Sequence, residues 1–347
     1  MSTFDPSVVN NMFLRKLDSE PDFEKKASAK LTGYIRDRIR DTVFARKILG
    51  THTITPQECQ VSVRHEGLVY IHEMEPDSSA MSMAWTGEPW TQYVRPKKYE
   101  IPFFQIGTKE FAIHENELMA TRLALTKIVE KNAINDMGTV EDHRFLTMCE
   151  ACAVQTGKVV KGVNCLSGTA SGDIEVDDIQ HIKNSLAEDR RAGTTLLVND
   201  VDLNGLMKWN ALEMGDKWKG EQVWGNAQAD KIFGLKVIRT AKTNLLKSGN
   251  IWLFCDPEWV GLFLLLAGFP KAEVRKERSK ITWSSWEMLG MSIANGRAMA
   301  KLELYAGTTQ SLPTEEELFK PDIAIPPKDG DVTIDQVPPP TPTINIY

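Results

Sequence analysis

The residues best suited to redox or metal chemistry in this sequence are Cys149 and Cys152. A C-x-x-C spacing is used by dithiol redox centres and by halves of zinc sites. Here, however, Phe145, Met148, Cys149 and Cys152 fall at i, i+3, i+4 and i+7, which is the stripe that a helix buries. His143 lies on the opposite face of that helix and cannot join them. We therefore predict that both cysteines are structural thiols.

A second segment is similar to a calcium-binding loop. Asp200–Gly205 reads D-x-D-x-N-G, but the twelfth position of such a loop must be a bidentate Glu and is Ala211 here. A strand, not a helix, is expected before it. The segment is more typical of a strand-to-helix turn in which Asn199 and Asp200 accept hydrogen bonds from free amides.

Other motifs for catalysis are weak. Gly168–Gly172 (GTASG) is a loose match to a phosphate-binding loop but lacks the G-K-[ST] ending, so a hinge is favoured. The sequence contains no H-E-x-x-H or G-x-S-x-G motif. We predict no catalytic, metal or cofactor site.

Composition describes a globular protein with room for one large or two modest domains. Of the 347 residues, 42% are hydrophobic and 25% are charged. The five cysteines are an odd number and are scattered, which favours a reducing compartment. No apolar segment follows Met1, so we expect neither a secretory signal nor a membrane anchor.

Charge is unevenly distributed along the chain. Residues 1–50 hold ten Lys/Arg against seven Asp/Glu, whereas residues 308–347 hold seven Asp/Glu against two Lys. The N-terminus is therefore a mildly basic arm and the C-terminus an acidic tail that also contains eight of the 17 prolines. The near-neutral middle has no basic stripe of the kind that grips nucleic acid.

The first element with a clear period is a helix over Tyr34–Leu49. Ile35, Ile39 and Val43 share its apolar face. The opposite face carries charges of alternating sign, Arg36, Asp37, Arg40 and Asp41. A solvated face is favoured over a nucleic-acid contact.

Strand composition follows, in Val61–Ile71, Lys97–Ile106 and Phe111–Ile113. The residues between the first two strands have no period but carry three aromatics, Trp85, Trp90 and Tyr93. We predict a long two-stranded excursion whose aromatic tip contacts a protein partner.

A long helical region comes next, with Leu118, Leu125, Val129 and Ala133 on one face. We expect an interruption at Asn135–Gly138, after which Thr139 caps a second helix.

The centre of the second half is Ile251–Pro270. Ile251–Phe254 predicts a strand, and Asp256 and Pro257 predict the start of a buried helix through Ala267, giving an α+β domain. Beyond it, Glu287–Tyr305 predicts a hairpin whose two-residue turn is Asn295-Gly296.

This order of parts resembles the major capsid proteins of tailed bacteriophages, which have the Hong Kong 97-type α+β fold. The resemblance rests on the strand-to-helix turn after Leu197, the strand that ends at Arg239 and the closing segment Met288–Leu304. It implies five parts: an N-terminal arm (1–57), an extended loop (58–98), a peripheral domain with a spine helix (99–165 and 271–307), an axial domain (166–270) and an acidic tail (308–347).

The resemblance also implies a function. The chain would self-assemble, as hexamers and pentamers, into the icosahedral head shell around the double-stranded DNA of a tailed phage. It would be a virion protein assembled in the host cytoplasm, with a portal, a separate scaffolding protein and a decoration protein as partners. Packaged DNA would be contacted non-specifically, and no enzyme activity, cofactor or membrane is implied.

Contacts between subunits are implied as well. The tip aromatics Trp85, Trp90 and Tyr93 would dock on a neighbouring subunit, and Trp218 and Trp224 would lie in the axial tip loop. Three arginines would engage adjacent chains or the interior: Arg36, Arg38 and Arg40.

One departure from the type member concerns Val61–Val94, which contains no lysine. We therefore predict that the shell lacks covalent isopeptide links through this loop. Two alternatives stay open: an encapsulin-like compartment that encloses a cargo enzyme, and a cytosolic enzyme with two lobes hinged at Gly157–Gly172.

Overall fold

A computed structural model describes residues 6–20, 22–61, 67–73, 98–121, 125–168, 174–206, 231–304, 312–314 and 318. Met1–Leu312 forms one compact unit and Pro313–Tyr347 a second. Within the described residues, no helix is long and apolar enough to cross a membrane. The predicted aromatic tip and axial tip loop lie outside the described residues.

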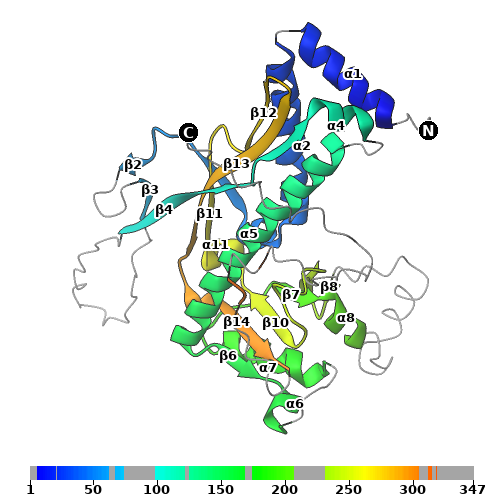
Figure 1. Cartoon of the computed structure of the whole chain (residues 1–347). Coiled ribbons are helices and arrows are strands. Elements are labelled where there is room, and N and C mark those ends of the chain that lie inside the picture. The colour runs from blue at the N-terminus through cyan, green and yellow to red at the C-terminus, as the bar shows by residue number, and fades with distance from the viewer. Residues whose placement is uncertain are drawn as a thin grey trace, which may run out of the picture. The chain divides into compact units, whose positions relative to one another are not determined.

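Helices dominate the N-terminal half (Figure 1). The helices are α1 (Pro6–Ser19), α2 (Phe23–Thr42), α3 (Phe44–Leu49), α4 (Glu115–Ala120), α5 (Leu125–Thr156), α6 (Val163–Leu166), α7 (Val176–Ala187), α8 (Asp200–Leu206), α11 (Pro257–Val260) and the 3₁₀ turn η1 (Gly296–Ala298).

The strands form two sheets. The eight-stranded sheet has the order β1-β11-β13-β4-β3-β2, with β12 and β5 also on β13. Its strands are β1 (Thr51–Ile54), β2 (Gln60–Val61), β3 (Leu68–Glu73), β4 (Lys98–Gly107), β5 (Phe111–His114), β11 (Gly261–Leu266), β12 (Lys271–Glu277) and β13 (Lys280–Ile293). The predicted excursion begins as the antiparallel pair β3–β4, in which Val69 lies opposite Pro102.

The six-stranded sheet has the order β6-β14-β10-β7-β9-β8. Its strands are β6 (Val159–Lys161), β7 (Thr195–Asn199), β8 (Lys231–Ile232), β9 (Leu235–Thr240), β10 (Asn250–Phe254) and β14 (Met299–Glu303). The strand predicted over Ile251–Phe254 is confirmed as β10, and every residue of it is buried.

Most of the described residues before Tyr34 are helical, which the sequence analysis missed. The helix α2 contains the predicted start at Tyr34 but begins at Phe23, and α1 precedes it. Both pack on the molecule rather than extending from it: Phe13 of α1 stacks on Trp283 of β13 at 6.5 Å between ring centroids. The predicted apolar face is confirmed, since Ile35, Ile39 and Val43 are fully buried.

The predicted break in the central helix is wrong. The helix α5 runs without interruption for 32 residues. Thr139 does not cap a helix, because its hydroxyl donates to the carbonyl oxygen of Asn135 one turn earlier at 2.6 Å. Gly138 allows close approach instead: a Cβ there would lie 2.8 Å from Val43 Cγ2.

The helix predicted over Trp259–Ala267 is also wrong. Asp256 and Pro257 do start a helix, but α11 ends at Val260 and the chain continues as β11. This strand lies between parallel β1 and antiparallel β13. A continuous apolar run suits such a buried central strand as well as a buried helix.

The predicted Asn295-Gly296 hairpin does not form. β13 and β14 belong to different sheets, and η1 carries the chain from one to the other. β14 is a central strand between β10 and β6. Lys301 and Glu303 of β14 are buried, with an ion pair of 3.5 Å between them.

The assignment of strands to the two sheets does not follow the domain boundaries predicted from the sequence. β11 belongs with the eight-stranded sheet and β14 with the six-stranded sheet. The predicted domain boundaries therefore stay a prediction.

Candidate functional site

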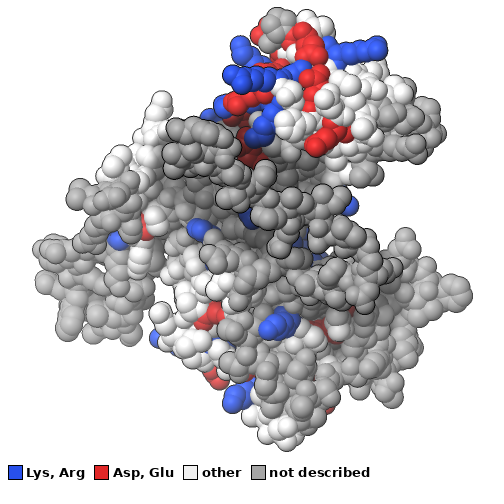
Figure 2. Space-filling view, in the orientation of Figure 1, with Lys and Arg blue, Asp and Glu red and all other residues white. Residues whose placement is uncertain are grey.

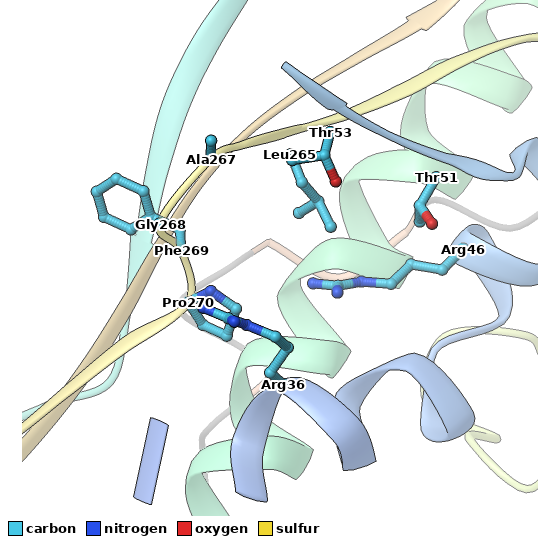
Figure 3. Close-up of a pocket in the computed structure, with 9 residues that line it drawn as sticks. All are labelled: Arg36, Arg46, Thr51, Thr53, Leu265, Ala267, Gly268, Phe269 and Pro270. Atoms are coloured by element: carbon cyan, nitrogen blue, oxygen red, sulfur yellow. The ribbon is translucent and has the colours of Figure 1, made fainter. Parts of the chain in front are cut away.

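Two of the three predicted contact arginines are exposed on α2, on the side opposite the buried isoleucines. Arg38 lies over the ring of Tyr34, with 6.0 Å between the guanidinium carbon and the ring centroid. Arg36 lines a cavity (Figure 3). The backbone of Arg40 continues the helix, and its side chain lies outside the described residues.

The cavity next to Arg36 has a volume of about 340 Å³ and lies at the junction of α2, α3, β1 and the turn after β11. Leu265 and the Ala267–Pro270 turn form its apolar side, and Thr51 and Thr53 its polar side. Figure 3 shows the side chains of Arg36 and Arg46 reaching toward the same space. Arg46 is already paired, so Arg36 is the lining cation that can meet a carboxylate from another molecule.

Arg46 is the centre of a buried charge cluster. Its guanidinium donates two hydrogen bonds of 2.7 Å to Glu141 on α5 and one of 2.7 Å to Glu287 on β13. The side chains of both glutamates are completely buried. The cluster therefore joins α3, the central helix and the eight-stranded sheet at one point.

A third buried carboxyl group, that of Asp142, extends this cluster. Asp142 accepts from the backbone N–H of Ala45 at 3.0 Å and pairs with Lys242 Nζ at 2.5 Å. Lys242 also donates to the carbonyl oxygen of Gly138. The segment before β10 is thus tied to α5 and α3.

Burial governs the protonation of these carboxyls. Burial raises the pKa of Asp142 to about 7, although Lys242 opposes the shift. Burial, and then the charge of Glu141, holds the pKa of Glu287 well above its ordinary value. Glu287 Oε1 is also buried without a hydrogen-bond partner among the described residues. Since solvent does not reach these groups, their role is to hold elements together rather than to act on a substrate.

The burial predicted for the cysteine pair is confirmed for Cys149 and is only partial for Cys152. Cys149 and Phe145 are fully buried, and Cys152 is half-buried. Burial raises the pKa of both thiols, which keeps them in the unreactive protonated form.

The predicted change from strand to helix is confirmed at Asn199–Asp200, because helix α8, which contains Asp200–Gly205, begins directly after strand β7. Asn199 ends β7, and its side-chain oxygen accepts from the N–H of Val201 at 3.0 Å. Asp202 accepts hydrogen bonds from Ser248 and from the N–H of Gly249, so it fixes the loop before β10.

Sequence analysis missed two surface features. Trp259 was placed in a buried helix but is 56% exposed, with the Arg191 guanidinium carbon 4.9 Å from its ring centroid. The second feature is a row of side chains on α2, Glu24, Ser28 and Thr32, that contacts β12. Their spacing of four residues was the available signal. The remaining predicted contacts lie outside the described residues: Trp85, Trp90, Tyr93, Trp218 and Trp224.

No protein-family model matches the sequence, and no curated protein matches it. Solved structures do match. The capsid structure of the cyanophage P-SCSP1u superposes with a TM-score of 0.54 over 76% of this chain and 88% of that chain, at 10% identity. A structure from Microbacterium phage Oxtober96 gives 0.53 over 76% and 91%, at 12% identity. One from Mycobacterium phage Che8 gives 0.51 over 75% and 90%, at 12% identity. The predicted α+β fold of the Hong Kong 97 type is confirmed.

Proposed function

We propose that this chain is the major capsid protein of a tailed phage and self-assembles into the icosahedral shell that encloses the DNA genome. The observation that carries the proposal is the fold shared with the cyanophage capsid over three quarters of the chain. Fold alone does not fix function, so the surface must also suit the role.

The described surface supports a shell subunit. Opposite charges are intermixed on α2 and β12, which favours contacts with other subunits over tight binding of DNA. Strands β3 and β4 pair at the two ends of the predicted excursion, and arms that wrap neighbours bury more area than one flat face. The enzyme alternative gains no support from Asp142 and Glu287, because both are inaccessible.

The finer parts of the proposal concern partners and contacts. We include in the proposal that the chain forms hexamers and pentamers and assembles in the host cytoplasm. Its proposed partners are a portal, a separate scaffolding protein and a decoration protein, and packaged DNA is contacted non-specifically. We assign intersubunit contacts to three aromatics of the excursion and two tryptophans of the axial tip loop, with arginines of α2. These are Trp85, Trp90, Tyr93, Trp218, Trp224, Arg36, Arg38 and Arg40.

Size-exclusion chromatography with light scattering tests the proposal. The intact chain, co-expressed with its scaffolding protein, should elute as particles of megadalton mass. Replacing Trp85 and Trp90 by Ala should abolish the particles and leave a folded subunit with an unchanged melting temperature. A misfolded variant would refute the contact assignment. An intact chain that stays a small oligomer with scaffold present would refute the shell function.

A further inference from the structure

The acceptor row of α2 (Glu24, Ser28 and Thr32) covers the outer edge of β12. Glu24 Oε1 accepts from the N–H of Lys276 at 3.0 Å, and Ser28 Oγ accepts from the N–H of Val274 at 3.0 Å. Thr32 Oγ1 accepts from the N–H of Ala272 at 2.9 Å. The match is geometric: four helical residues rise about 6.0 Å, and two strand residues span about 6.6–6.8 Å.

This row replaces a neighbouring strand. Among the described residues β12 pairs with β13 alone, so the amides of its other edge would otherwise be open. An open edge is a template for adding a strand from another chain. From this arrangement we infer that the outer edge of β12 is a strand-pairing site for a second copy of this chain, which the acceptor row of α2 keeps closed in the folded subunit. The inference concerns a surface and does not rest on the shell function.

The charges of β12 identify the partner strand as β12 itself. Its sequence, KAEVRKE, alternates exposed charged residues with more buried ones. In an antiparallel pair centred on Val274, Lys271 lies opposite Glu277 of the second copy, and Glu273 lies opposite Arg275. Lys271, Glu273, Arg275 and Glu277 then each lie opposite a residue of opposite charge, which favours a two-fold interface.

These charges are available at the surface. In the subunit Arg275 contacts Glu273 at 2.9 Å and Glu277 at 3.4 Å, and all three side chains are well exposed. Figure 2 shows positive and negative side chains intermixed over the end of the molecule that carries α1, α2 and β12. Arg275 and Glu273, which form an ion pair within one β12 strand, can therefore form ion pairs between two β12 strands.

Gly33 directly follows the acceptor row and lowers the stability of helix α2 at that position. Gly33 is inside α2, where glycine disfavours the helix, and it is exposed. A Cβ at this position would meet no atom within 4 Å, so packing does not require glycine. We assign Gly33 as the hinge about which α1 and the first part of α2 lift from β12. The Phe13–Trp283 stack and the Asp18–Lys276 ion pair hold that segment down in the closed state.

Hydrogen exchange of the β12 amides tests the closed state. In the subunit, Ser28→Ala/Thr32→Val should speed exchange of the β12 peptide on the order of tenfold or more, because two acceptors are lost. Thr42→Val is the matched control: among the described residues, the Thr42 hydroxyl donates only to carbonyl oxygens of its own helix. Gly33→Ala should slow exchange about twofold to fivefold. If the double variant fails to fold, Gly33→Ala decides alone, and unchanged or faster exchange in it overturns the hinge.

Analytical ultracentrifugation tests the partner. The Ser28→Ala/Thr32→Val subunit should dimerise more strongly than the intact chain. Adding Glu273→Arg should abolish this gain by placing like charges opposite each other, and Glu273→Arg/Arg275→Glu should restore it. A double variant whose β12 amides exchange faster but which stays monomeric overturns the inference. A dimer whose association is unchanged by Glu273→Arg also overturns it. Dimers without closed particles would contradict the shell function and support this inference, so the two outcomes are distinguishable.

Discussion

The Arg46 cluster and the acceptor row of α2 both join segments that lie far apart in the chain, one inside the molecule and one at its surface. In the cluster, a single guanidinium holds two carboxylates that solvent does not reach. In the row, each of three partly exposed acceptors binds one backbone N–H of β12. The row lies next to Gly33, which weakens the helix. The first contact cannot be opened without leaving buried polar groups unpaired, whereas the second can be exchanged for an equivalent strand contact. A subunit with both can keep a fixed body while one surface changes partners.

The largest effect that would test this contrast comes from Arg46→Ala. Removal of the guanidinium leaves Glu141 and Glu287 buried and unpaired, so we expect a loss of roughly 3–5 kcal/mol in the free energy of unfolding. Urea denaturation measures it. Arg275→Ala is the control, because Arg275 contacts two carboxylates at the surface and its loss should leave the midpoint unchanged. Equal effects of the two substitutions would contradict the contrast.

The next effect is the pH dependence contributed by Asp142. Its folded-state pKa, about 7, is above the ordinary value of 3.8, so the folded protein binds this proton more tightly than the unfolded chain. The contribution is therefore fully present below about pH 4 and is lost as the pH rises to about 7. Between these limits we expect a fall in stability of at most roughly 4 kcal/mol.

Asp142→Asn isolates this contribution. The variant should lack the corresponding part of the slope of unfolding free energy against pH, measured by urea titration at several pH values. A slope identical to that of the unmodified chain would show that Asp142 stays ionised beside Lys242.

A smaller effect is expected at Gly138, where α5 meets the α2–α3 junction. An added Cβ would lie 2.8 Å from Val43 Cγ2 and cannot be accommodated without movement. Gly138→Ala should cost roughly 1–3 kcal/mol in unfolding free energy despite the better helix propensity of alanine. A stabilised variant would show that the junction is loosely packed.

The smallest effect has the opposite sign. Gly33→Ala adds a methyl group into open space on a helix, so it should stabilise the subunit by roughly 0.5–1 kcal/mol. Thermal denaturation of Gly138→Ala and Gly33→Ala compares the effect of an added methyl group at the packed junction with its effect at the hinge. A destabilising Gly33→Ala would mean that the surrounding helix needs the glycine.

The sequence allowed single elements with a clear local pattern to be predicted, but not the full order of elements or the pairing of the strands. Ile251–Phe254 and the Ile35–Ile39–Val43 face were identified correctly, since burial of a short apolar run or of one helical face depends on local pattern. Gly261–Leu266 was assigned to a helix because its residues are apolar on every side. Only the sheet reveals why a strand begins there: a Cβ at Gly261 would lie 2.1 Å from the carbonyl oxygen of Ser292.

Contacts between segments far apart in the chain were harder to predict. Glu24, Ser28 and Thr32 look like part of a solvated helix face until β12, more than 200 residues later, is placed beside them. Likewise, Asn295-Gly296 is a strong turn signal, yet which strands flank the turn is decided by β10 and β11 in two separate sheets. Long-range strand pairing carries no local signature.

Negative-stain electron microscopy of the purified chain, expressed alone and with the scaffolding protein that we propose for it, tests the shell assignment most directly. We predict closed icosahedral particles, or rings of capsomers, in at least the co-expressed sample. A homogeneous monomer in both samples would contradict the assignment of this chain to the phage head shell.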